Sequence, residues 1–290
     1  MVAGNGFGNV WCLVAMPVWL AGCAAAPLDR AGSLSSYDRL TESDGVLTKS
    51  KLHVDGPAVL AAKTVHIIPT VFSASAENVP ISEKQRGLIT NSVDRSMCIG
   101  LSDRFRIVGA SEGADLTVHA VVTHMIPTDE KAVGVSKVAS VAKTVVLPGV
   151  PVPIPRLPIG LGSLSMEAEA TGPGGDQLAA MVWGRGANFL SGSARVSTSG
   201  DAYELASVFG NDFSKMLVSG KTPFKSGPSL PSMQKFNSML GGAPKEAACE
   251  AYGRSPGVAG MIGGAVGMPE SWTDKRGAGA APSAPPTATN

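Results

Sequence analysis

The first 23 residues most constrain what this chain can fold into. No charged side chain occurs between Met1 and Gly22, and residues 10–21 (VWCLVAMPVWLA) form a nearly continuous apolar run. A run of about 12 residues is too short to cross a bilayer core, which needs about 20. It has the length of the apolar region of a secretory signal peptide, and it ends in small residues as a cleavage site does. We therefore expect the folded part to be built from the residues that follow.

The sequence Leu20-Ala21-Gly22-Cys23 resembles the lipobox of bacterial lipoproteins. In those proteins lipid is attached to the cysteine thiol, and the peptide before the cysteine is removed. The resemblance implies a signal peptide over residues 1–22 and a fatty-acylated (palmitate-bearing) Cys23 that holds the chain at a membrane. Residue 24 is Ala rather than Asp, which by the same resemblance implies the inner leaflet of the Gram-negative outer membrane, facing the periplasm. A buried N-terminal strand or helix that happens to end in cysteine is the alternative.

Of the four cysteines, processing would remove Cys12 and lipidation would use Cys23. Cys98 and Cys249 would remain in an oxidising compartment, where disulfides persist. We expect these two to pair and to fasten the C-terminal region to the main domain. Two separate buried thiols are the alternative.

Charge and composition exclude one class of partner. Lysine and arginine number 24 against 23 acidic residues, so the net charge is 24 − 23 = +1, and aromatic residues make up only 5%. A polybasic protein that binds nucleic acid by releasing counterions is thereby excluded, and a surface that stacks on bases is improbable on composition. We expect no nucleic-acid partner.

Hydrophobic periodicity predicts an α+β fold: a mainly antiparallel sheet covered on one face by two helices. The clearest helix should begin after Ser82, which forms a capping box with Gln85. A Gly-Pro-Gly-Gly sequence at residues 172–175 indicates a hairpin turn. The expected elements are strands at 63–72, 105–108, 115–126, 166–171 and 178–187, and helices at 80–104 and 201–218.

Composition shifts divide the rest of the chain. We expect a lipid-anchored tether over residues 23–36 and the α+β domain over 37–220, with a Pro/Gly-rich insertion at 131–165. A linker and short helical extension should span 221–272, with helical pieces at 233–240, 247–252 and 258–266. Residues 273–290 read as a disordered tail.

The insertion is the predicted interaction surface. It carries Lys131, Lys137, Lys143 and Arg156 and no acidic residue. Val135, Val138, Ala142 and Val145 keep helical spacing, and residues 150–158 (VPVPIPRLP) must be extended. An apolar stripe beside side chains that are all positively charged suits anionic lipid headgroups or an acidic partner. The alternative is a helix and loop packed on their own domain.

Several segments together are similar to the DUF 3313 lipoproteins, bacterial proteins of unknown function. The likeness covers about residues 34–220, and residues 249–275 look like an extension in one branch of that family. It implies a lipid anchor and a periplasmic α+β domain, and it brings no catalytic residues. The matching segments are LSSYDRL at 34–40, the strand at 65–72, RLPIGLG at 156–162 leading into MEAEA at 166–170, and MVWGR at 181–185.

Two patterns offer a catalytic alternative, a periplasmic hydrolase. Ser111 lies in a G-x-S-x-G sequence, but a strand rather than the required helix should follow it, which favours a simple loop. Glu167 and Glu169 share one face of a strand, as paired hydrolase carboxylates can. A solvated polar face that pairs with Arg185 across the hairpin is the simpler interpretation.

The histidines predict no metal site. His119 and His124 are five residues apart on one strand and should point to opposite faces. His124 shares a face with apolar residues and is expected in the core. No Cys-x-x-Cys or His-Glu-x-x-His sequence occurs, so no metal or cofactor is expected.

These observations favour a non-enzymatic, membrane-anchored module that binds an envelope protein or anionic lipid. The first alternative is the hydrolase, which would use Ser111 or the pair Glu167 and Glu169. The second is a structural spacer that self-associates through its C-terminal extension.

Overall fold

The computed structural model describes residues 26–134, 160–188, 195–224, 232–275 and 277. Eight strands form one sheet, in the order β1–β2–β8–β7–β6–β3–β5, with β4 also paired to β6. The strands are β1 (Thr41–Glu42), β2 (Lys49–Val54), β3 (Thr64–Ile67), β4 (Val71–Phe72), β5 (Arg106–Ile107), β6 (Leu116–Ile126), β7 (Ser163–Thr171) and β8 (Gln177–Gly186).

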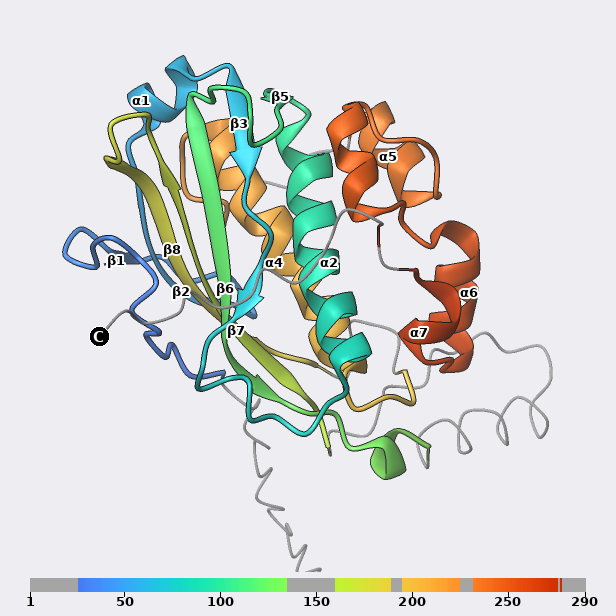
Figure 1. Cartoon of the computed structure of the whole chain (residues 1–290). Coiled ribbons are helices and arrows are strands. Elements are labelled where there is room, and N and C mark those ends of the chain that lie inside the picture. Colours follow the sequence, from blue (N-terminus) through green and yellow to red (C-terminus); the bar gives the residue numbers. More distant parts are fainter. Residues whose placement is uncertain (1–25, 135–159, 189–194, 225–231, 276, 278–290) are drawn as a thin grey trace, which may run out of the picture.

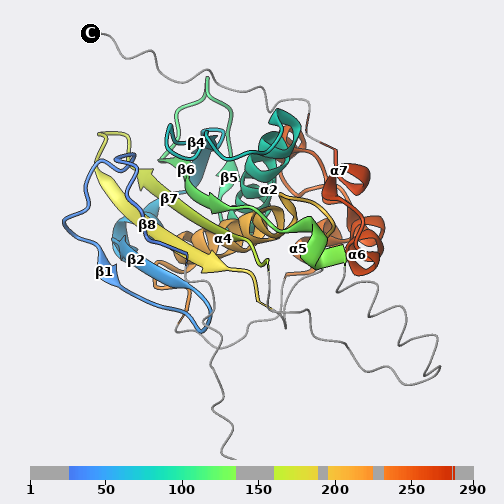
Figure 2. The same cartoon turned by 90° about the horizontal axis from the view of Figure 1, so that it is seen from below.

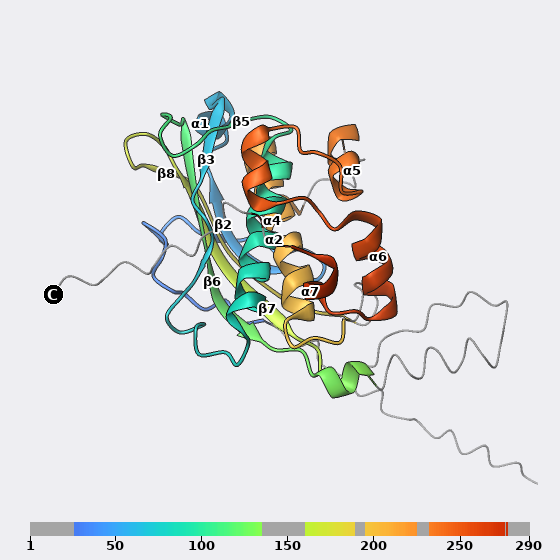
Figure 3. The ribbon, with the colours of Figure 1, turned by 45° about the vertical axis from the view of Figure 1, so that its right-hand side comes forward.

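The described helices pack in layers on one side of this sheet (Figure 1). The long helices α2 and α4 contact the sheet, and the C-terminal helices lie outside α2, as the edge-on view in Figure 3 shows. The helices are α1 (Gly56–Ala61), α2 (Glu83–Leu101), α4 (Gly200–Ser219), α5 (Met233–Met239), a 3₁₀ helix (Ala247–Tyr252), α6 (Gly257–Val266) and α7 (Glu270–Thr273).

This arrangement confirms the predicted α+β class. The pairings β1–β2, β2–β8, β8–β7 and β7–β6 are antiparallel, whereas β3, β4 and β5 join in parallel. The hairpin between β7 and β8 turns where the glycine-rich sequence predicts. Gly175 has a φ of +82° there, a backbone conformation that glycine adopts without strain.

Helix α2 begins as its sequence predicts. The Ser82 hydroxyl accepts from the Gln85 amide, and the Gln85 side chain accepts from the Ser82 amide, which completes the capping box. Apolar side chains recur every four residues along α2 and form a buried stripe, with Ile89, Val93 and Met97 all at 0% exposure. This stripe therefore faces the sheet and α4 and forms the main core of the domain.

Aromatic side chains join α4 to the sheet. Trp183 of β8 is completely buried and meets Phe209 of α4 edge-on, with ring centroids 5.5 Å apart. Phe209 stacks on Phe213 one helical turn later, at 6.0 Å. Such aromatic pairs add to the free energy of burying their apolar area, so they fix the position of α4 on the sheet.

The strand expected at 63–72 is two strands, separated around Pro69. Proline removes a backbone donor, and the next amide, that of Thr70, donates to the Asp94 carboxylate of α2 at 3.1 Å instead of to a neighbouring strand. Two further elements, β2 and α1, lie at residues for which no strand or helix is predicted.

The C-terminal extension follows its predicted helices closely, but residues 273 and 274, the first of the expected tail, are folded. Thr273 closes α7, and Asp274 is buried at 4% exposure. None of the described helices is long and apolar enough to span a bilayer. The predicted signal peptide, Cys23 and the patterned part of the insertion (residues 135–159) lie outside the described residues.

Candidate functional site

Residues 26–40, here called the strap, cover the sheet face that the helices leave open (Figure 3). Leu34 is 7% exposed and packs with Ala180 and Val182 of β8. Leu28, Tyr37 and Leu40 pack around the same small cluster. The sequence placed residues 23–36 in a tether, but the structure packs them on the sheet from Ala26 onward.

Glu167 of β7 holds the strap through its carboxylate. The amide and hydroxyl of Ser33 donate to Oε2 at 3.3 Å and 2.5 Å, and the Ala31 amide donates to Oε1 at 3.1 Å. The Tyr37 hydroxyl lies 2.8 Å from both carboxylate oxygens. Glu167 itself is 0% exposed. A buried carboxylate is costly unless hydrogen bonds satisfy it, and here the strap supplies the donors.

Glu169 repeats this arrangement two residues along the strand. The amide and hydroxyl of Ser35 donate to it at 2.8 Å and 2.7 Å. The Gln177 side-chain amide of β8 donates at 2.8 Å and also reaches the Ser36 carbonyl. The two glutamates thus tie successive parts of the strap to one strand.

The prediction of a solvated Glu167–Glu169 face was therefore wrong. The two residues do share a face, but the strap buries it. Arg185 is also not their partner, because it follows Trp183 by two residues and so shares the helix-covered face. Burial lowers the pKa of Arg185, and the Asp212 carboxylate of α4 partly opposes this.

The strap begins at one particular end of the sheet, which we call the insertion end. The Ser165 hydroxyl donates to the Pro27 carbonyl at 2.5 Å. A Cβ on Gly184 would lie 2.9 Å from the Ala26 carbonyl oxygen, so only glycine permits this crossing. β6 ends and β7 begins at the same end, with the insertion between them, as the lower part of Figure 1 shows. The first described residues therefore lie where the insertion leaves the sheet.

The described part of the insertion is fixed at its two ends. The Asp129 amide donates to the Gly160 carbonyl at 3.0 Å. Residues 130–134 are helical, with Val133 completely buried and Lys131 exposed. The other three predicted surface residues, Lys137, Lys143 and Arg156, lie outside the described residues.

A disulfide and a buried ion pair fasten the C-terminal extension to α2. Cys98 and Cys249 are joined, as the sequence predicts, across a separation of 151 residues. Arg95 donates to both Asp274 oxygens, at 3.1 Å and 2.6 Å, and the Tyr203 hydroxyl of α4 donates to Asp274 at 2.6 Å. Burial alone would lower the pKa of Arg95, but the Asp274 carboxylate outweighs it and raises that pKa.

A family model now identifies the chain. The model described as "Protein of unknown function (DUF3313)" matches residues 29–213. The chain belongs to the DUF3313 family. The matched region starts inside the strap and ends inside α4, so it contains the sheet, α2, the first part of α4 and the two strap-binding glutamates. The C-terminal extension of this DUF3313 protein lies beyond the match.

The solved structures that match include two dodecamers of PelC from Paraburkholderia phytofirmans, each 11% identical to this DUF3313 chain. A single-substitution PelC variant has a TM-score of 0.34 and covers 57% of this chain and 95% of its own. The second structure has a TM-score of 0.36, with 63% and 100% covered. No curated protein matches the chain significantly.

Ser111 of this DUF3313 protein lies in an exposed loop between β5 and β6, and a strand follows it, as the sequence predicts. The loop is held by Glu112, which pairs with Arg106 at 3.2 Å and accepts from the Gly109 amide. These contacts lower the pKa of Glu112, the Gly109 amide contributing most. The loop thus lacks the strand-to-helix turn that raises a nucleophilic serine.

The prediction that His119 and His124 point to opposite faces was wrong. A bulge between Val122 and His124 shifts the register of β6. His124 Nδ1 consequently lies 3.3 Å from the Asp29 carboxylate of the strap rather than in the core. His119 lies beside Glu169 on the same face, and burial lowers its pKa while the Glu169 charge opposes the shift. No group of three metal-ligating side chains occurs in the described part of the chain.

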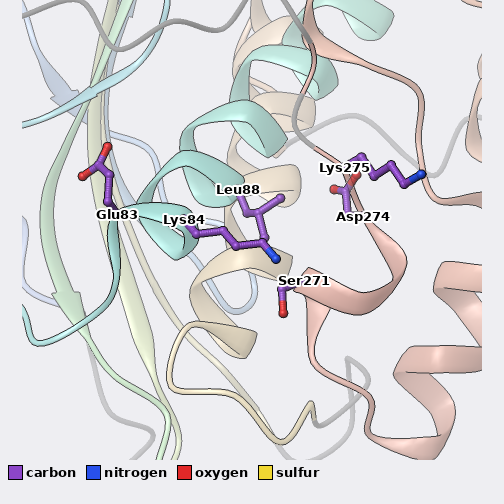
Figure 4. Close-up of a pocket in the computed structure, with 6 residues that line it drawn as sticks. All are labelled: Glu83, Lys84, Leu88, Ser271, Asp274 and Lys275. Carbon is purple, nitrogen blue, oxygen red and sulfur yellow. The ribbon is translucent and has the colours of Figure 1, made fainter.

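A hollow of about 540 Å³ opens between the start of α2 and the residues around α7 (Figure 4). It lies over the buried ion pair, because Asp274 is both a lining residue and the partner of Arg95. The Asp274 carboxylate is occupied there by Arg95 and Tyr203. The lining residues are Glu83, Lys84, Leu88, Ser271, Asp274 and Lys275.

Proposed function

We propose that this DUF3313 protein is a lipid-anchored, non-catalytic module that binds the periplasmic surface of the outer membrane through its insertion. One observation carries the proposal: the strap pins Ala26 at the insertion end, and only three residue steps separate it from Cys23. Three extended residues reach about 10 Å. An acylated Cys23 would therefore hold the insertion end against the bilayer.

Electrostatics supports lipid as the insertion's ligand. Residues 131–165 carry four basic side chains and no acidic one, and Lys131 is exposed at the insertion end. Each basic side chain near an anionic lipid surface contributes about 1 kcal/mol to the free energy of membrane binding. The insertion would add this attraction to the lipid anchor, because stable anchoring takes more than one signal.

A non-catalytic role fits the occupied carboxylates. Glu167 and Glu169, the candidate hydrolase pair, accept hydrogen bonds from the strap, and Glu169 accepts a further one from Gln177 of β8. Ser111 lies in an exposed loop whose nearest acidic residue is engaged with Arg106. A panel of ester, peptide and glycoside substrates tests this point: activity that Ser111→Ala or Glu169→Gln abolishes would establish the hydrolase alternative instead.

Mass spectrometry of the native chain tests the anchor. We expect the mature N-terminus to be Cys23 carrying fatty acyl groups, and we expect a Cys23→Ser chain to keep its N-terminal peptide and leave the membrane fraction. An intact Met1 terminus with an unmodified Cys23 thiol would refute the anchor.

Flotation tests the insertion separately. The mature chain with Cys23→Ser is mixed with vesicles that contain or lack phosphatidylglycerol. We expect flotation with the anionic vesicles, and we expect Lys137→Glu with Lys143→Glu to abolish it. Lys63→Glu with Lys221→Glu is the matched control, because both lysines are exposed and lie away from the insertion end: Lys63 precedes β3, which runs parallel to β6, and Lys221 follows the C-terminal end of α4. Equal binding by both double variants would refute the proposed surface.

A further inference from the structure

Helix α6 is packed with its small side chains inward and its large ones outward. Its glycines at 257, 260, 263 and 264 are buried. A Cβ on Gly263 would lie 2.6 Å from Thr273 Cγ2, which shows how closely α6 approaches its neighbour. The opposite side presents Val258, Met261, Ile262 and Val266, which are 54%, 63%, 59% and 59% exposed.

The exposed surface continues onto the next helix. Met268 is 40% exposed, and Trp272 of α7 is 74% exposed. Residues 255–269 contain no charged side chain. An apolar surface of this kind, left open on a folded chain, marks an interaction site. We call it the α6–α7 face, made of Val258, Met261, Ile262, Val266, Met268 and Trp272.

This face adjoins the insertion end. The Val196 amide donates to the carbonyl of Gly267, directly after α6, at 2.9 Å. Two residues later the Thr198 amide donates to the Glu130 carboxylate, in the helical turn that opens the insertion, also at 2.9 Å. Figures 1 and 2 show the lower end of α6 close to that turn. Residues 196–198 therefore link the C-terminal end of α6 to the helical turn that opens the insertion, at the insertion end.

We infer that the α6–α7 face inserts into the lipid surface and forms a second, apolar membrane contact beside the insertion. This inference rests on the proposed function, which places the insertion end at the bilayer. Three residue steps between Cys23 and Ala26 would keep the insertion end, and with it the C-terminal end of α6, close to the bilayer. An uncharged helix face with an adjacent tryptophan suits the boundary between headgroups and acyl chains, where aromatic rings concentrate.

The mature chain contains its own reporter for this contact. Processing before Cys23 leaves two tryptophans, Trp183 and Trp272, of which Trp183 is 0% exposed and Trp272 is 74% exposed. Cys23 is also the one thiol outside the Cys98–Cys249 disulfide in that chain. The unlipidated mature chain can therefore be coupled through Cys23 to a maleimide-bearing lipid, which reproduces the anchor whether or not the native thiol is acylated.

Fluorescence on vesicles of brominated phosphatidylcholine tests the inference. We expect brominated acyl chains to quench Trp272 relative to unbrominated vesicles, and we expect Trp272→Phe to remove the quenched component while Trp183 emission persists. Ile262→Glu should lower the quenching, and Met261→Glu should do so independently. Met233→Glu is the matched control, since Met233 is 82% exposed on α5, away from the insertion end.

Two results would overturn the inference. Trp272 emission that bromine leaves unchanged in the coupled chain would show that the face does not meet lipid. A dimer or larger oligomer in sedimentation that Ile262→Glu dissociates, without quenching, would assign the face to a second copy of the chain. Acylation of the native Cys23 is measured separately, so failure of this inference is distinct from failure of the proposed anchor.

Discussion

The Tyr37 hydroxyl lies 2.8 Å from both carboxylate oxygens of Glu167, although 130 residues separate the two in sequence. This contact joins the segment that follows Cys23 to the central strand β7. Because Glu167 is completely buried beneath it, the strap is part of the domain rather than a loose connection to it. The orientation proposed for the domain on a membrane depends on this contact and its neighbours.

Replacement of Glu167 by Gln should release the strap. The described partners of the Glu167 carboxylate are all donors, so the amide nitrogen of glutamine would face donors at a buried position. We expect a loss of about 1–3 kcal/mol in the free energy of unfolding, the cost of unsatisfied buried polar groups. Limited trypsin digestion should cut faster after Arg30 and Arg39. Glu77→Gln, at an exposed position, should leave both measurements unchanged; strap cleavage equal in the two variants would contradict this.

Loss of the disulfide should destabilise the chain through its unfolded state. Cys98 and Cys249 are 151 residues apart, and in the chain-entropy model a loop of that length contributes about 5 kcal/mol. We expect the double Cys98→Ser, Cys249→Ser variant to unfold at a clearly lower urea concentration. Thiol counting of the denatured mature chain, with and without reductant, checks the bond itself. Cys98 and Cys249 thiols that react without reductant would refute it.

Removal of Asp274 should weaken the packing of the C-terminal extension on α2, although the disulfide still joins the two. Asp274→Ala would leave the Arg95 guanidinium buried without its bidentate partner, and breaking a buried pair in this way costs about 3–5 kcal/mol. Arg95→Met with Asp274→Leu removes both charges and should recover much of that loss. Urea unfolding of the single and double variants measures the difference. A double variant as unstable as Asp274→Ala would show that packing, not charge, holds the extension.

Two histidines under the strap should make the fold sensitive to acid. Burial lowers the pKa of His119, and burial together with the Arg39 charge lowers the pKa of His53, while Glu169 and Asp55 respectively oppose these shifts. Below the unfolded-state pKa of about 6.5 the unfolded chain binds protons that the folded chain does not, so stability falls as the pH falls.

We therefore expect the free energy of unfolding to be lower at about pH 5.5 than at about pH 7.5, and the combined His53→Gln, His119→Gln variant to lose most of the histidine part of this difference. Urea titrations at the two pH values give the comparison. An unchanged difference in the double variant would place the acid sensitivity elsewhere.

The sequence predicts elements whose signals are local and fails where the decisive contact is distant. The capping box at Ser82 and the hairpin glycines specify their own backbone geometry, so α2 and the β7–β8 turn could be placed without a structure. The period of two correctly puts Glu167 and Glu169 on one face, but it carries no information about what covers that face. Residues 26–40 have neither helical nor strand periodicity, so nothing local indicates that they pack as a strap.

The histidine error has a different physical origin. Side chains alternate along a strand only while each residue has one partner, and one extra residue at a bulge reverses the parity of all that follow. The bulge before His124 has this effect, and the sequence there contains no glycine or proline that would predict a bulge. A long strand therefore gives a weaker basis than one helical turn for predicting which side chains share a face, because a bulge can interrupt the alternation.

Close packing of α2 against α4 yields the last prediction. A Cβ on Gly210 would lie 2.7 Å from Ser96 Cβ and 2.8 Å from the Val93 carbonyl oxygen, distances that real contacts do not reach. Gly210→Ala would gain helix propensity, worth about 1 kcal/mol. It would also force the two helices apart across a core that resists overpacking, which typically costs about 1–3 kcal/mol. Because the backbone of α2 cannot move aside as a flexible side chain can, we expect net destabilisation and a lower melting temperature. Gly113→Ala is the control, since a Cβ there meets nothing within 4 Å. A Gly210→Ala chain as stable as that control would mean that the helices are less tightly apposed than these distances require.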